Sequence, residues 1–66
     1  MRLLVNGESR DVTDDIDVRA LVETVGANPE GVAVAVNGEV VPRGQHREHR
    51  LREGDRVEVI RAVGGG

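Results

Sequence analysis

The last three residues, Gly64, Gly65 and Gly66, have the clearest chemical potential in this sequence, because they carry the terminal carboxylate. Glycine adopts almost any backbone conformation and lets another surface approach closely, so such a carboxylate can enter a narrow active site. Glycines are equally typical of a frayed chain end or a cloning remnant. We expect residues 64–66 to form a flexible tail behind a domain at residues 1–63.

No other set of residues has the inventory of a catalytic site. The chain has no cysteine, which excludes thiol catalysis and thiolate metal sites, and it shows no Ser-His-Asp, paired-carboxylate or phosphate-loop pattern. His46 and His49 have the spacing of a helical turn, but no carboxylate or thiol completes a metal-ligand set. We expect both histidines to lie in a solvated loop. The sequence therefore predicts a protein that is not an enzyme and that binds no cofactor or metal.

The composition of the chain further narrows the class of protein that it can belong to. The chain has 66 residues and a formal charge of −3, with no aromatic residue and no lysine among its nine cations. The net charge and the absence of stacking side chains argue against binding to nucleic acid. No apolar run approaches the roughly 20 residues that span a bilayer, and no signal-peptide pattern opens the chain. We expect a cytoplasmic protein, monomeric when free.

Two Asn-Gly pairs, at residues 6–7 and 37–38, predict the turns of two β-hairpins, because both residue types accept the positive φ of a type I′ turn. The many valines favour strands. Pro42 ends the second hairpin because it has no N–H for a ladder. The predicted strands lie at residues 1–5, 9–12, 32–36, 39–41 and 56–63.

The stretch between the hairpins predicts one main helix at about residues 18–25. Asp17 is suited to the N-cap, and Gly26 follows the last apolar residue, where a left-handed C-cap is favoured. Four apolar residues have the i, i+3, i+4, i+7 spacing of one helical stripe: Val18, Leu21, Val22 and Val25.

The order ββαβββ predicts an α+β fold of one domain, the β-grasp or ubiquitin-like architecture. In this fold we expect a mixed sheet of about five strands with the helix on one face. The last strand would lie parallel to the first, flanked by the two hairpins. Leu3 and Val5 would face the helix, leaving Leu4 and Ile60 on the open face. Exposed apolar residues often mark interaction sites, so we expect these two to contact a partner.

The sequence resembles the ThiS family of sulfur carriers from thiamin biosynthesis over its whole length. The stretch Val-Asn-Gly-Glu-Val-Val-Pro-Arg at residues 36–43 matches this family. Its Asn-x-x-x-Val-Pro-Arg pattern, Asn37 to Arg43, most separates the family from its molybdopterin-synthase relatives. The Glu-Gly-Asp turn at residues 53–55 and the final diglycine complete the match. Gly64 departs slightly from the family, which commonly has another small residue there.

This resemblance implies a specific chemistry. An E1-like enzyme would adenylate the carboxylate of Gly66 with ATP and Mg²⁺, while Gly64 and Gly65 thread into that partner. Sulfur from a cysteine desulfurase-type donor would then give a thiocarboxylate, which a thiazole synthase would consume.

Several alternatives stay open at this point. The carrier could serve another pathway, such as molybdopterin, cysteine, thio-natural-product or tRNA thiolation. A ubiquitin-like modifier would use the same activated glycine to form amide bonds, and a passive β-grasp module would not use it at all. Arg43 opens an arginine- and histidine-containing segment at residues 43–52, which is either a solvated loop or a docking site for an acidic partner surface.

Overall fold

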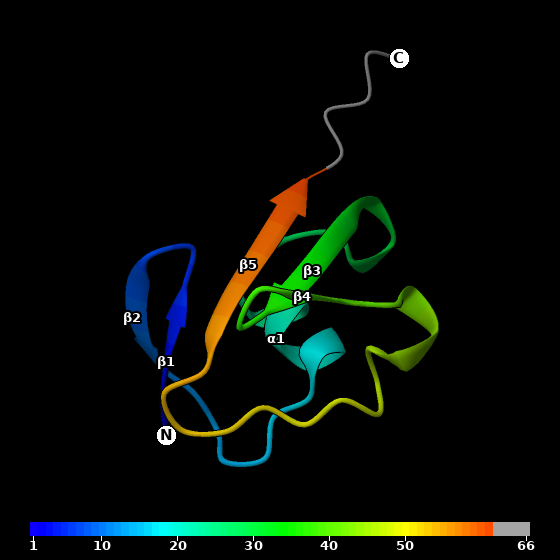
Figure 1. Ribbon diagram of the computed structural model, residues 1–66. Helices are drawn as coiled ribbons and strands as arrows, with labels where there is room; N and C mark the ends of the chain where they lie inside the picture. The colour runs from blue at the N-terminus through cyan, green and yellow to red at the C-terminus, as the bar shows by residue number, and fades with distance from the viewer. Residues whose placement is uncertain (62–66) are drawn as a thin grey trace.

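The computed structural model describes residues 1–61, which form one sheet of five strands with a single α-helix packed across it (Figure 1). The elements follow the predicted order ββαβββ. The last two residues of the predicted fifth strand, 62 and 63, and the glycine tail lie outside the described residues. The elements are β1 (Arg2–Val5), β2 (Glu8–Asp11), α1 (Val18–Thr24), the 3₁₀ turn η1 (Pro29–Gly31), β3 (Val32–Val36), β4 (Glu39–Val41), the 3₁₀ turn η2 (Arg43–Gln45) and β5 (Arg56–Arg61).

Both predicted hairpin turns are confirmed. The φ angle is 51° at Asn6 and 83° at Gly7, and it is 52° at Asn37 and 87° at Gly38. These left-handed conformations are the ones that a two-residue type I′ turn requires. Since the first turn has only two residues, Val5 pairs with Glu8, and β2 begins one residue earlier than predicted.

The sheet order β2-β1-β5-β3-β4 places the last strand in the centre. β5 runs parallel to β1 and antiparallel to β3, so each hairpin contributes one neighbour to it (Figure 1). The predicted β-grasp topology is therefore confirmed for the described residues. Its consequence is that the strand nearest the chain end is also the strand that joins the two hairpins into one sheet.

The helix begins and ends as its capping residues predict. The carboxylate of Asp17 accepts a hydrogen bond of 2.7 Å from the backbone N–H of Ala20. At the other end, Gly26 has a φ of 81°, and the N–H groups of Gly26 and Ala27 donate to Glu23 and Val22. This pair of bonds is a Schellman motif, which satisfies carbonyls of the last turn. The helix is one residue shorter than predicted, because Val25 is its C-cap.

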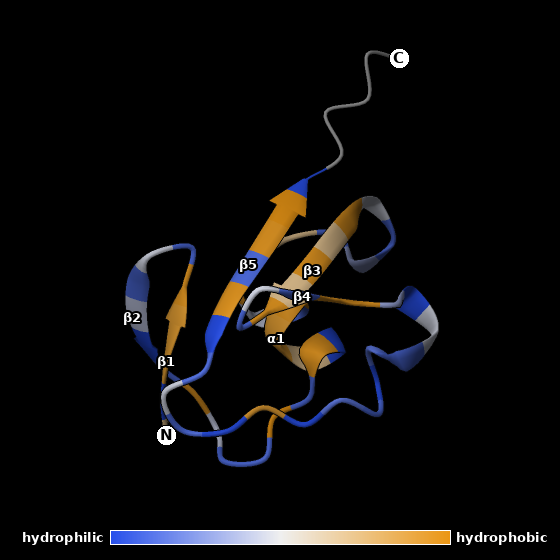
Figure 2. Ribbon diagram, in the orientation of Figure 1, coloured by the Kyte–Doolittle hydropathy of each residue, from blue (hydrophilic) through white to orange (hydrophobic). Residues whose placement is uncertain are grey.

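An aliphatic core lies between α1 and one face of the sheet. Figure 2 shows apolar residues on β1, β3, β5 and α1, whereas β2 and the loops are largely hydrophilic. Leu3 and Val5 are buried and Leu4 is not, as predicted. None of the helices within residues 1–61 has the length and apolarity needed to cross a membrane. The most completely buried side chains are Leu3, Val18, Leu21, Val22, Val34, Leu51 and Val57.

His46 corrects one sequence-based prediction. It does not lie in a solvated loop, because only 3% of the residue is exposed. Its Nε2 atom lies 2.9 Å from the carbonyl oxygen of Val41, and its own carbonyl accepts the N–H of Arg19. The prediction was wrong because η2 turns the chain so that His46 lies against the end of β4 and the first turn of α1, which no local pattern indicates. Part-exposed His49 does not share this environment, and within residues 1–61 no metal-binding group of His and acidic side chains forms.

These two environments predict different mutational costs. His46→Ala should lower the free energy of unfolding by about 2–3 kcal/mol, because it removes a buried hydrogen bond and leaves a cavity. His49→Ala should change it by less than about 0.5 kcal/mol, as is usual for a surface substitution. Urea denaturation followed by circular dichroism measures both values. Equal costs for the two variants would contradict a structural role for His46.

Candidate functional site

The open face of the sheet, on the side opposite α1, is the surface that a partner can reach without disturbing the core. Because strand residues alternate between the two faces, the burial pattern and strand register assign the residues of this face. Leu4 is 40% exposed and Ile60 is 55% exposed, so both predicted outward positions are confirmed. The open face comprises Leu4 from β1, Ala33 from β3, Val40 from β4, and Arg56, Glu58 and Ile60 from β5. Ala35 of β3 has the register of this face but is only 8% exposed.

Val40 is the member of this face that the sequence reasoning missed. It is 72% exposed, the largest exposed fraction among the three outward-facing large apolar residues. Val40 pairs with Ala35, and Ile60 pairs with Ala33, so two large side chains flank two alanines on the intervening strand. The alternation of Val40 with buried Val41 could have revealed it, but only once the inner side of β4 had been fixed.

Charged groups interrupt the apolar surface. A hollow of about 570 Å³ is lined by Leu4, Arg56 and Glu58 together with both hairpin turns. Towards the outer edge, Arg2 of β1 donates to Asp11 of β2, with 3.0 Å between Nε and Oδ1. This hydrogen bond and the neighbouring positive charge hold the pKa of Asp11 below its ordinary value. The face thus combines apolar contact area with cationic and anionic groups.

Ile60 of the open face lies close in sequence to the terminal glycines. β5 ends at Arg61, directly after Ile60 and five residues before Gly66. Gly64, Gly65 and Gly66 lie outside the described residues. At the maximum extension of a polypeptide, five residues reach no more than about 18 Å. A partner that binds Ile60 therefore has the chain end within a short reach.

Arg43 occupies a different place from the other predicted contact residues. It is exposed, and it begins η2 after β4 has ended at Val41. A second hollow, of about 380 Å³, lies beside it between β4 and the segment leading to β5, with Arg50 and Arg52 among its lining residues. The structure therefore brings Leu4 and Ile60 to one face and leaves Arg43 outside the sheet.

The sequence pattern of the ThiS family matches residues 3–66 of this chain. The chain is 29% identical to the sulfur carrier protein ThiS of Escherichia coli over 66 residues, covering all of both proteins. The fold is also similar to the crystal structure of the thiamine biosynthesis protein ThiS from Geobacter metallireducens. The two structures match over the full length of both chains, with 35% sequence identity and a TM-score of 0.85.

A second kind of relative is longer. The chain is 35% identical over 66 residues to a thiazole synthase of Paramagnetospirillum magneticum, and 36% identical to one of Magnetococcus marinus. It spans only 20% of the length of each of these proteins. The family match covers nearly the whole sequence and agrees with the β-grasp topology described above. This chain therefore belongs to the ThiS family.

Proposed function

We propose that this protein is a sulfur carrier of thiamin biosynthesis that delivers sulfur from a thiocarboxylate on Gly66 for thiazole formation. The observation that carries the proposal is the family match over residues 3–66, together with whole-length similarity to the E. coli sulfur carrier. The exposed apolar residues of the open face, Leu4, Val40 and Ile60, are compatible with binding to a partner enzyme. The chemistry belongs to partner enzymes that act on the chain end.

The reaction follows from the properties of a carboxylate. An α-carboxyl group has a pKa of about 3.3–3.7 and is ionised at neutral pH, so it is a poor electrophile. An E1-like enzyme with ATP and Mg²⁺ would let a carboxylate oxygen of Gly66 attack the α-phosphorus, with pyrophosphate leaving. The outer sulfur of a persulfide on a cysteine desulfurase-type donor would then attack the carbonyl carbon, so that a C–S bond forms as AMP departs with the carboxyl oxygen. A thiol of the partner system would reduce the S–S bond of the resulting acyl disulfide and leave the thiocarboxylate on Gly66. The carrier contributes only a reachable carbon.

Thiazole synthase is the proposed acceptor of the sulfur. Two relatives named thiazole synthase contain a segment similar to this entire chain, so a carrier-like segment and that name occur together in one protein. In this protein, the open face would dock to the E1-like adenylating enzyme through Leu4, Val40 and Ile60. Arg43, exposed beyond the end of β4, is proposed as a further contact for an acidic surface.

Intact mass spectrometry tests the function directly. The protein is incubated with ATP, Mg²⁺, an E1-like enzyme and a sulfur donor, and fragmentation then locates any change. We expect the mass increase that accompanies replacement of one oxygen by sulfur, confined to Gly66. Amide-linked conjugates without a thiocarboxylate would instead identify a protein modifier, and no reaction at all would overturn the proposal.

Substitution within the tail tests the need for narrow access. Gly65→Val should abolish adenylation, measured as ATP–pyrophosphate exchange, because a branched side chain blocks entry into a narrow site. Its circular dichroism spectrum should stay native. Gly44→Val is the control, since a Cβ atom at Gly44 would meet no atom within 4 Å. Undiminished exchange by Gly65→Val would refute the threading of the tail.

Introducing a negative charge on the apolar surface tests whether the open face docks to a partner. Ile60→Glu and Val40→Glu should each raise the KM for the carrier in adenylation by roughly tenfold, equivalent to about 1.4 kcal/mol, because a carboxylate is placed against an apolar partner surface. Leu4→Glu should act in the same direction. Thr13→Glu adds the same charge at an exposed position in the connector before α1 and should leave KM unchanged. If all four variants behaved alike, the open face would not be the docking surface.

A further inference from the structure

The side chain of Asn6 continues the sheet where the backbone of β1 stops. β1 and β5 pair only through Leu4 with Arg56 and Val5 with Val57. The N–H of Asn6 then donates to the carbonyl of Val57 at 2.9 Å, and the chain turns away into β2. Beyond that point, Asn6 Oδ1 accepts the N–H of Val59 at 2.8 Å, and Nδ2 lies 3.4 Å from the carbonyl oxygen of Val59.

This contact satisfies backbone groups that would otherwise have no strand beside them. Successive residues of a strand direct their N–H and C=O groups to opposite neighbours, so residues i and i+2 face the same neighbour. Val57 directs its carbonyl to β1, so Val59 directs its own groups to the same side. The short β1 does not extend that far, and the carboxamide supplies both an acceptor and a donor. Asn6 thus acts as a substitute for one more residue of β1.

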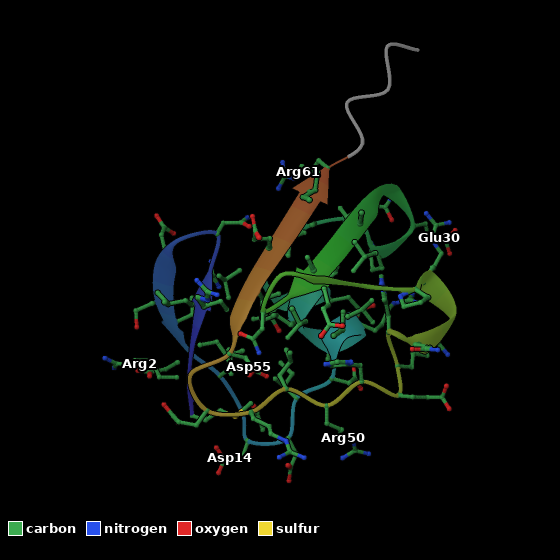
Figure 3. All side chains as sticks on the ribbon, viewed as in Figure 1. Arg2, Asp14, Glu30, Arg50, Asp55 and Arg61 are labelled. Carbon is green, nitrogen blue, oxygen red and sulfur yellow. The ribbon has the colours of Figure 1, made fainter. Side chains whose placement is uncertain are left out.

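Asn37 makes a matched contact at the other end of β5. It has the same turn position and nearly the same φ as Asn6. Its Oδ1 accepts the N–H of Arg56 at 2.9 Å, and its Nδ2 donates to Asp55 Oδ1 at 3.0 Å. Figure 3 labels Asp55 and Arg61 at the two ends of β5. Asn37 holds the beginning of the strand, and Asn6 holds the half nearest the chain end.

We propose that Asn6 is a positioning residue for the activation of Gly66, an inference that rests on the proposed function. β3 pairs with Val59, Ile60 and Arg61 along one edge of β5, and Asn6 fixes the other edge at Val59. We infer that this second contact sets the point from which the chain continues towards Gly66. If the strand from which the chain end extends fluctuates, the reacting carboxylate spends less time in the productive geometry, even when the carrier is bound. Asn6 acts through Val59 and does not contact the reacting atoms.

Glycine substitutions at the two asparagines separate this role from simple stabilisation. Asn6→Gly and Asn37→Gly both keep the positive φ of the turn and remove the side chain. Both should lower the melting temperature. Asn6→Gly should speed amide hydrogen exchange at Val59 beyond the loss of global stability that the two variants share. Only Asn6→Gly should lower the kcat of adenylation, by about tenfold with KM changed less than about threefold. Asn6→Asp keeps the acceptor for Val59, so its kcat should stay within about threefold of the wild type.

Each outcome of these measurements decides a different point. Equal losses of kcat in the two glycine variants would overturn the positioning role, as would a fall in kcat for Asn6→Asp while its Val59 amide stays protected. If Asn6→Gly did not fold, the comparison of Asn6→Asp with the wild type would still decide the matter. Failure of the wild type to become adenylated would overturn the proposed function, whereas amide exchange at Val59 would still report whether Asn6 holds β5.

Discussion

The insertion of β5 between the two hairpins is the interaction on which the rest of the structure depends. β1 and β3 do not pair with each other, so β5 supplies the hydrogen bonds that make one sheet of them. It also contributes Val57 and Val59 to the core beneath α1. The hairpin turns reinforce this arrangement, because each places an asparagine side chain on the β5 backbone. Turn chemistry and sheet assembly therefore depend on the same two residues.

The sequence was sufficient to predict those structural features whose signals lie within a few neighbouring residues. Asn-Gly pairs specify type I′ turns through their backbone preferences, and Asp17 and Gly26 mark the helix ends through capping. Strand faces could be assigned for β1 and β5, since Leu3 and Val59 alternate with outward residues. From these elements the topology followed, because a last strand reached by a long linker has a central place open between two hairpins.

The features that sequence reasoning missed depend on how folded segments contact one another. His46 is buried because η2 brings it against Val41 at the end of β4 and Arg19 of α1, whereas in the sequence it stands among arginines. Val40 joins the open face because β4 pairs with β3 in one register. The turns were a sufficient explanation for Asn6 and Asn37, so no pattern suggested that their side chains also contact β5. Such contacts form between surfaces that exist only after folding.

The central position of β5 also means that the open face forms only when the last strand is present and folded. Asn6 and Val59 lie 53 residues apart in the sequence, and contacts of such separation form slowly because a long loop must close first. A chain lacking β5 would contain two hairpins with no strand between them and no Ile60 on the open face. The strand that precedes residues 62–66 is thus also required to assemble the exposed apolar face of the sheet. A partner that recognises this surface would thereby select chains in which the final strand is present and folded.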